Sequence, residues 1–411
     1  MTAATRTHPA GAKRLASLDI IRGLIMVFMA LDHVRLYFTN ADAPPEDFSE
    51  GGLLLFLVRW ITHFCAPGFF FLAGVGVFLF EQTKGAKEPV VKFLISRGIW
   101  LVLLEVTLIG FAWSFNPGWN WAGVIWSLGF SFIFMAALVF LPRIVLLFLS
   151  LGVLLFHDAV AIHFGLAPFI TSDPWIVFLY TGGIMDVPLI GERFILYSII
   201  PWLALMALGY AVGGIFKLPA GDQRKILIHA GIAMTVGFLV LRLTNLYGTQ
   251  DPLWLFTLPG TFSPGDGIAD TIASLLNANK YHASLQFVLM TIGPMLVMAG
   301  WLAQKDVSKP GPGAGALRAL DIFGRVPFFY YILHLYLIHI LAFIYTLAGG
   351  FAADYMFWDG LFNNTNRPDG YGFGPLGVLL VWGLVVRILY YPCRWFQGVK
   401  SSKPHWWLKY L

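Results

Sequence analysis

The sequence is poor in charge and almost free of cysteine. Only 12% of its 411 residues are Asp, Glu, Lys or Arg, whereas a soluble globular domain has roughly 25%. The two cysteines, Cys65 and Cys393, lie in apolar or interfacial segments, so they can build neither a disulfide framework nor a cysteine-based zinc site. The net charge of +5 is not the footprint of a nucleic-acid-binding protein. The composition thus lies outside the soluble and disulfide-rich classes.

Several catalytic motifs are also missing. There is no Walker A loop, no His-Glu-x-x-His, no Gly-x-Ser-x-Gly and no dinucleotide-binding glycine fingerprint. His334 and His339 are five residues apart, which puts their side chains about 140° apart on a helix. Two histidines that bind one zinc ion from a single helix are instead four residues apart. We therefore expect no metal site.

Long apolar runs are what the sequence has in abundance. The set AVILMFWYC supplies 58% of the residues, and the mean hydropathy is +0.73. A helix that crosses a hydrocarbon core needs roughly 20 apolar residues, and about ten segments meet this requirement. They are 17–38, 53–80, 93–115, 121–141, 144–164, 194–216, 226–246, 282–304, 326–348 and 373–394. The sequence predicts an all-α, polytopic integral membrane protein.

The charged residues between these segments predict the orientation. Most of the 27 Lys and Arg residues fall in the termini and in one set of alternating loops, whereas Asp and Glu dominate the other set. The positive-inside rule then puts both termini in the cytoplasm. We expect a cytoplasmic tail over 1–16, a transmembrane domain over 17–396 with a flexible cytoplasmic linker near 305–318, and a second tail over 397–411.

Ionisable residues inside a span are costly, so each is a candidate for function. The first span is the richest in them. Asp19 and Arg22 are three residues apart and can pair on one helix face. His33 follows Arg22 by eleven residues, which brings it back to within about 20° of the same direction and about 16 Å further along the axis. Alternatively, Arg22 snorkels to the headgroups and His33 is an interfacial polar residue.

The second and third spans contribute further candidates. His63 lies one turn from Arg59, and Pro67 frees the carbonyl of His63 and predicts a kink. His63 could equally be a packing residue. Glu105 lies in the middle of the third span, where we expect it to pair with a basic or histidine side chain from another span, as a structural clamp or as a catalytic group.

Runs of sequence now point to a known family. The run Arg14-Leu-Ala-Ser-Leu-Asp-Ile-Ile-Arg-Gly23, followed by Leu31-Asp-His33, resembles the start of the multi-span acyltransferases related to heparan-α-glucosaminide N-acetyltransferase, most of all a bacterial branch designated as a domain of unknown function. The resemblance continues through 59–74, 201–213, 279–294, 323–334 and 391–396. The chain departs from the animal enzyme in having no histidine within 40–52.

The resemblance implies transfer of an acetyl or similar acyl group from cytoplasmic acyl-CoA to an amino or hydroxyl group of a glycan-like acceptor outside, across a bacterial inner membrane. Acyl transfer needs a base, donors for an oxyanion and cations for the CoA phosphates. We assign His33 as general base, Asp32 as the residue that orients it, and His63 as its assistant or a transient acyl carrier. Candidates for the CoA phosphates are Arg22, Arg97 and Arg325, and candidates for the acceptor are Arg35, Arg59 and Trp60.

Two other functions stay open at this stage. A proton-coupled or solute transporter could use the same charged stripe, although no repeat relates two halves of the chain. A structural membrane scaffold would leave the charged residues of the first span unexplained. For the acyltransferase, the expected partners are the lipid bilayer, acetyl-CoA or another acyl-CoA as co-substrate, and the outer acceptor. We expect no nucleic acid, and a homodimer is compatible with the sequence.

Overall fold

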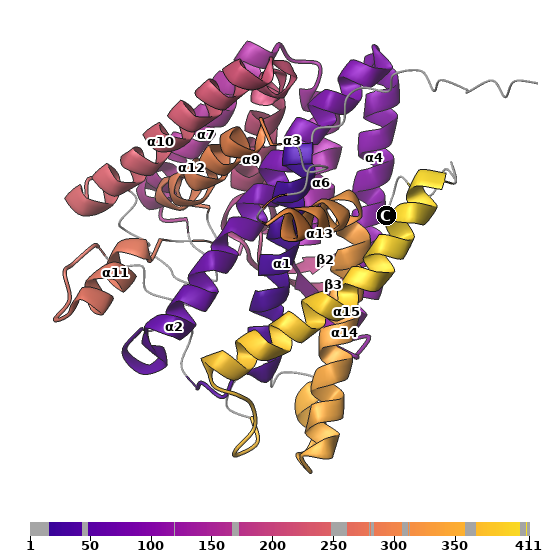
Figure 1. The fold of residues 1–411 in the computed structure, drawn as a ribbon. Helices are drawn as coiled ribbons and strands as arrows, with labels where there is room; N and C mark the ends of the chain where they lie inside the picture. Colours follow the sequence, from indigo (N-terminus) through magenta and orange to yellow (C-terminus); the bar gives the residue numbers. More distant parts are fainter. Residues whose placement is uncertain are drawn as a thin grey trace, which may run out of the picture.

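The structure is a computed structural model of the chain. It describes residues 16–42, 48–118, 120–166, 172–247, 261–278, 280, 283–305, 311, 313–357, 367–402 and 408. Almost all of the regular structure is helical (Figure 1). The α-helices (α), with the shorter 3-10 and π segments (η), are α1 Ala16–Phe38, α2 Phe48–Ile61, η1 Thr62–Phe64, α3 Cys65–Lys84, α4 Lys87–Leu104, η2 Glu105–Ile109, α5 Gly110–Ser114, α6 Val124–Leu138, α7 Arg143–Phe164, α8 Pro174–Ile176, η3 Val177–Thr181, α9 Ile199–Val212, η4 Gly213–Lys217, α10 Ala220–Thr244, α11 Ile268–Leu276, α12 Leu285–Leu302, α13 Ala314–Arg325, α14 Pro327–Ala348, η5 Ala353–Met356 and α15 Pro375–Ser402.

Each of the predicted spans overlaps at least one helix. Within the described residues, 8 helices are long and apolar enough to cross a membrane. The other two predicted spans correspond to α1, which carries charged residues along its length, and to α6, which has only 15 residues. The prediction of an all-α polytopic membrane protein is therefore confirmed. The total of about ten spans and the cytoplasmic location of both termini stay predictions.

Helix α1 occupies the centre of the bundle. It contacts α3, α12, α13, α14 and α15 (Figure 1). The outer positions belong to α7, α10 and α15, whose most apolar windows are only 28%, 22% and 22% buried, against 67% for α9 and α12. Apolar surface left exposed by these helices suits contact with lipid. The ionisable residues of α1 therefore lie inside the protein.

Two glycines allow α1 and α13 to cross closely. A Cβ atom on Gly23 would lie 1.9 Å from the carbonyl oxygen of Leu320, and one on Gly324 would lie 1.6 Å from that of Asp19. Small residues allow helix backbones to approach in this way. The crossing brings Asp19 and Arg22 next to Arg325. Helix α13 begins at Ala314, inside the linker predicted near 305–318; 306–310 and residue 312 lie outside the described residues.

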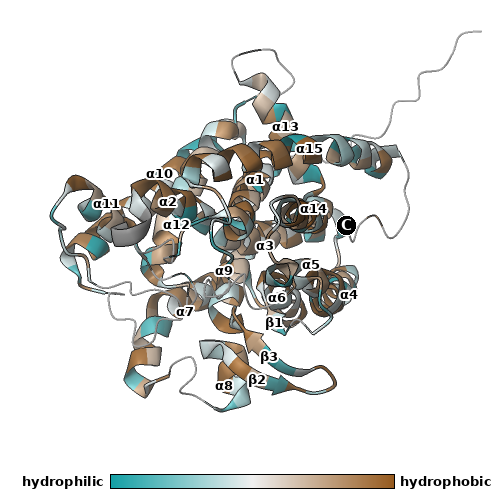
Figure 2. Ribbon diagram, turned by 90° about the horizontal axis from the view of Figure 1, so that it is seen from below, coloured by the Kyte–Doolittle hydropathy of each residue, from teal (hydrophilic) through white to brown (hydrophobic). Residues whose placement is uncertain are grey.

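A small sheet was not predicted. Its strands are β1 Trp121–Ala122, β2 Gly183–Val187 and β3 Gly191–Ile195, in the order β1-β3-β2. β1 pairs with β3 in parallel, and β2 pairs with β3 antiparallel. Figure 2 shows hydrophilic residues in the β2–β3 hairpin, at the edge of the helix bundle. The starts of the predicted spans 121–141 and 194–216 were therefore wrong, because these apolar residues form strands.

The second and third spans are both interrupted. The 3-10 turn η1, which includes His63, separates α2 from α3, four residues before Pro67. This agrees with the predicted break, since proline cannot donate a hydrogen bond to the carbonyl four residues earlier. In the third span, the π segment η2 begins at Glu105. π-bulges are frequent at functional sites, and a 3-10 stretch inside a helix often marks a functional hinge. Both interruptions therefore mark candidate functional positions.

Candidate active site

Two histidines from distant parts of the chain meet beside α1. The Nδ1 atom of His33 on α1 lies 2.7 Å from the Nε2 atom of His334 on α14, and their rings stack at 4.9 Å with 14° between the planes. Trp113 of α5 packs edge-on against His33 at 4.7 Å. His334 is fully buried, whereas His33 is half-buried. Of the two rings, His334 is therefore enclosed by protein, whereas part of His33 is accessible to a ligand.

The hydrogen bonds determine which nitrogen of His33 can act as a base. The Nδ1 atom of His334 lies 3.1 Å from the carbonyl oxygen of Tyr330. A carbonyl only accepts, so this nitrogen carries the proton, and Nε2 of neutral His334 must accept the Nδ1–H of His33. The remaining nitrogen of His33, Nε2, then holds a lone pair and has no partner among the described residues. The arrangement presents one oriented imidazole base.

A cavity gathers the three arginines that were predicted to bind CoA. It has a volume of about 410 Å³ and is lined by Arg22, Arg97 and Arg325, together with Lys400. Asp19 accepts a hydrogen bond from Arg22 at 3.1 Å, as predicted for the pair. Asp321 accepts one from Arg325 at 2.7 Å. Guanidinium groups bind phosphate in bidentate fashion, so this cavity, hereafter the arginine pocket, suits a phosphorylated ligand.

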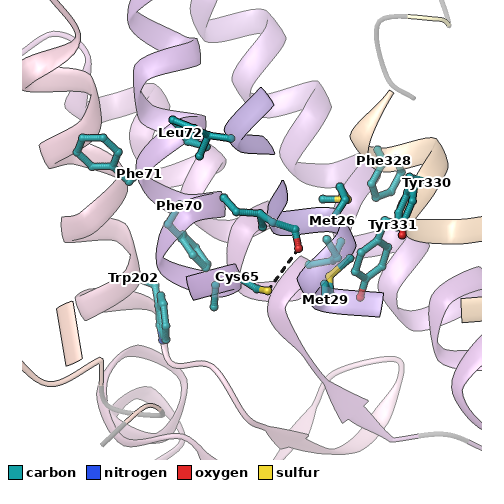
Figure 3. Close-up of a cluster of buried hydrophobic side chains, with 14 of the residues drawn as sticks. Met26, Met29, Cys65, Phe70, Phe71, Leu72, Trp202, Phe328, Tyr330 and Tyr331 are labelled. Carbon is teal, nitrogen blue, oxygen red and sulfur yellow. Dashed lines mark hydrogen bonds between the residues drawn. The ribbon is translucent and has the colours of Figure 1, made fainter. Parts of the chain in front are cut away.

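The arginine pocket extends toward the histidine pair. Its wall includes Met26 of α1 and Tyr331 of α14. The ring of Tyr331 packs edge-on against that of His334 at 5.4 Å. Figure 3 shows Met26 and Met29 between Cys65 of α3 and the aromatic side chains of α14, including Tyr331. One aromatic side chain thus separates the pocket from His334.

The carboxylate of Asp32 binds two arginines. One oxygen accepts from Arg35 at 3.0 Å and the other from Arg59 at 2.6 Å. Asp32 was expected to orient His33, but its oxygens are directed to the guanidinium groups, and His334 bonds to the ring instead. Arg35 and Arg59, expected to bind the acceptor, lie together around Asp32. The third residue of that set, Trp60, donates to the sulfur of Met290 at 3.3 Å.

His63, the predicted assistant of His33, lies in η1 and packs against α12. Its buried ring packs edge-on against Phe287 of α12 at 5.5 Å. Within the described part of the chain its Nδ1 atom has no hydrogen-bond partner, and neither a hydrogen bond nor a ring contact joins His63 to His33. His63 follows Arg59 by four residues, and Arg59 binds Asp32, so His63 lies near this ion pair.

Glu105 does not have the partner expected for it. One carboxylate oxygen accepts the backbone N–H of Gly123 at 2.7 Å, and the other is buried without a partner among the described residues. Among the described residues no basic or histidine side chain from another span bonds to Glu105, and the backbone at the start of α6 supplies its donor instead. Glu105 therefore links α4 and η2 to α6.

Sequence reasoning missed His334 and Tyr331 as members of the site. His334 was considered only with His339 as a metal pair, and the described residues contain no group of three or more His, Cys, Asp or Glu that could hold a metal ion. The signal was present, since an ionisable residue inside a span is a functional candidate by default. Tyr331 lies three residues before His334, on the same helix face.

The structure is that of a polytopic membrane protein with an arginine-lined pocket close to a hydrogen-bonded pair of histidines. Residues 14–247 match the family model described as heparan-alpha-glucosaminide N-acetyltransferase, catalytic. The match covers more than half of the chain, and the chain therefore belongs to this family of membrane acetyltransferases. A search of curated proteins finds no matching relative. The matched region contains His33, Arg22 and Arg97, whereas Arg325 and His334 follow it.

Proposed function

We propose that the protein transfers an acetyl or similar short acyl group from cytoplasmic acyl-CoA to an amino or hydroxyl group of a glycan-like acceptor on the outer side of a bacterial inner membrane. One observation carries the proposal. Helices α1 and α14, which bear His33 and His334, also line the arginine pocket, and Tyr331 lies between the pocket and the histidine pair. A donor with phosphates at one end and a thioester at the other requires such an arrangement.

The donor would enter with its phosphates among Arg22, Arg97 and Arg325. These residues lie on the first turns of α1, in α4 and at the end of α13. Helix α1 runs from Arg22 to His33 over about 16 Å, so an extended pantetheine arm in the pocket would point its thioester toward the histidines. The basic loops predict that the arginine end faces the cytoplasm, where acyl-CoA is made.

In this mechanism, His33 activates the acceptor. Its Nε2 atom removes a proton from the acceptor amine or hydroxyl while that group bonds to the acyl carbon, which gives a tetrahedral intermediate. The C–S bond then breaks, and the CoA thiolate takes the proton from the His33 imidazolium. His334 accepts the Nδ1–H of His33 throughout, so the proton is taken up and released at Nε2 of His33. Arg35, Arg59 and Trp60 on the acceptor side would contact the acceptor.

The test uses the full chain in inside-out vesicles. Acetyl-CoA is added outside the vesicles, and a panel of amino sugars, other glycans and small amines is loaded into their lumen, which corresponds to the outer side. The release of free CoA thiol is followed with time. We expect acceptor-dependent release by the wild type and loss of it in His33→Ala. If no acceptor gives thiol release and the same protein carries a flux of protons or a solute, the acyltransferase proposal is wrong and the transporter is favoured.

A further inference from the structure

Tyr331 lies where the arginine pocket meets the histidine pair. Its side chain is 3% exposed and lines the pocket. Along α14 it precedes His334 by three residues, or about 4.5 Å of helix rise, on the side of Arg325. The thioester of a donor anchored by the arginines has to pass or stop at this level before it can reach a nucleophile activated by His33.

The hydroxyl group of Tyr331 is available to a ligand. It has no hydrogen-bond partner among the described residues, and it is not one of the fully enclosed polar atoms that lack a partner, unlike the hydroxyl of its neighbour Tyr330. Because Tyr331 lines the arginine pocket, a ligand in the pocket can reach this side chain. A polar group kept inside an apolar cavity without a protein partner costs free energy unless a ligand or water bonds to it.

The ring of Tyr331 is held firmly. It stacks on Phe328 at 6.2 Å with 5° between the planes, and it packs edge-on against His334. The guanidinium group of Arg97 covers the same Phe328 at 5.1 Å. The hydroxyl is thus positioned by packing before any ligand arrives, which is the condition for a donor that stabilises developing charge without reorganisation.

We propose that Tyr331 is a further catalytic residue, whose hydroxyl donates a hydrogen bond to the thioester carbonyl oxygen. This inference rests on the proposed acyl transfer. As the acceptor bonds to the acyl carbon, the carbonyl electron pair moves onto oxygen, and the Tyr331 O–H stabilises that negative charge while keeping its own proton. When the C–S bond breaks, the pair returns to re-form the carbonyl, and the sulfur leaves as described for the CoA thiolate.

The substitution Tyr331→Phe removes only the hydroxyl and keeps both ring contacts. We expect kcat to fall about 10²- to 10³-fold, as for loss of one oxyanion donor, with the dissociation constant of acetyl-CoA unchanged. The matched control is Tyr345→Phe, which removes a hydroxyl from the same helix outside the pocket and should turn over at the wild-type rate. Equal kcat for Tyr331→Phe and the wild type would overturn the inference, as would an equal loss of turnover and acetyl-CoA affinity.

A second measurement separates stabilisation of the oxyanion from a structural role. Trifluoroacetonyl-CoA, a ketone whose hydrate is tetrahedral, should bind the wild type more tightly than acetyl-CoA, and Tyr331→Phe should lose that preference while its melting temperature stays the same. An unchanged preference would overturn the inference. If the wild type itself releases no CoA thiol with any acceptor, the proposed function fails; if it does and only the Tyr331 results disagree, the function stands.

Discussion

The Nδ1 atom of His33 and the Nε2 atom of His334 lie 2.7 Å apart although 301 positions separate the residues in the sequence. The carbonyl of Tyr330 fixes the tautomer of His334, and His334 in turn fixes that of His33. A base with one defined lone pair is what general base catalysis needs. The predictions below test this pair and the groups around it.

Replacement of His33 by Ala should remove the base. We expect kcat for acyl transfer to fall by about 10²- to 10⁴-fold, the contribution typical of general base catalysis, with acyl-CoA affinity retained. Release of CoA thiol under saturating acetyl-CoA measures kcat. The control is His229→Ala, an exposed histidine of α10 bonded to a carbonyl of its own helix. A His33→Ala enzyme that matches this control would exclude His33 as the base.

Replacement of His334 should act through His33. His334→Ala leaves the Nδ1–H of His33 without its acceptor, so both the tautomer and the ring orientation are lost, and we expect kcat to drop at least about 10-fold. In His334→Gln, the side-chain oxygen can stand near the former Nε2 position and accept the same proton, so part of the rate should return. Identical kcat values for the Ala and Gln variants would argue against a positioning role.

The three arginines of the pocket should contribute to donor binding and little to the chemical step. Arg22→Gln, Arg97→Gln and Arg325→Gln should each raise KM for acetyl-CoA roughly 10-fold or more, since a hydrogen bond to a charged group contributes about 1.5–3 kcal/mol. Arg387→Gln, an exposed arginine of α15 outside this pocket, is the control. Acetyl-pantetheine lacks the nucleotide phosphates, so its turnover should be insensitive to all four substitutions. A fall in its turnover with Arg22→Gln would contradict the assignment.

Asp32 should matter for stability more than for the acid–base step. The substitution Asp32→Asn removes the negative charge that binds both Arg35 and Arg59. We expect the free energy of unfolding to fall by about 1.5–3 kcal/mol. Thermal unfolding in detergent measures the effect. If Asp32 instead oriented His33 directly, the variant would lose kcat without losing thermal stability.

The contact between α1 and α13 should tolerate no side chain at Gly324. Gly324→Ala would place a Cβ atom 1.6 Å from the carbonyl oxygen of Asp19, and overpacking of this kind costs about 1–3 kcal/mol or more. We expect a lower melting temperature and weaker acetyl-CoA binding, because Arg22 and Arg325 move apart. Gly383→Ala on α15, which meets nothing within 4 Å, should change neither. A stable Gly324→Ala protein with full affinity would contradict this packing.

Local pattern was enough for the helices and failed where the contacts are remote. The helical repeat placed Arg22 and His33 on one stripe, and the three-residue spacing paired Asp19 with Arg22. The same local reasoning joined Asp32 to its neighbour His33, yet Asp32 bonds to Arg59, 27 residues further on. Glu105 was expected to meet a side chain and instead meets the backbone of Gly123.

The sequence alone determined that this is a helical membrane protein and approximately where its membrane-spanning helices lie, because the length and apolarity of a segment are local properties that decide whether it can cross a bilayer. Only the tertiary structure decided which side chains share a site. Helices far apart in the sequence pack side by side, and a bond such as that of His33 with His334, or the approach of Tyr331 to the arginine pocket, has no signature in either segment by itself.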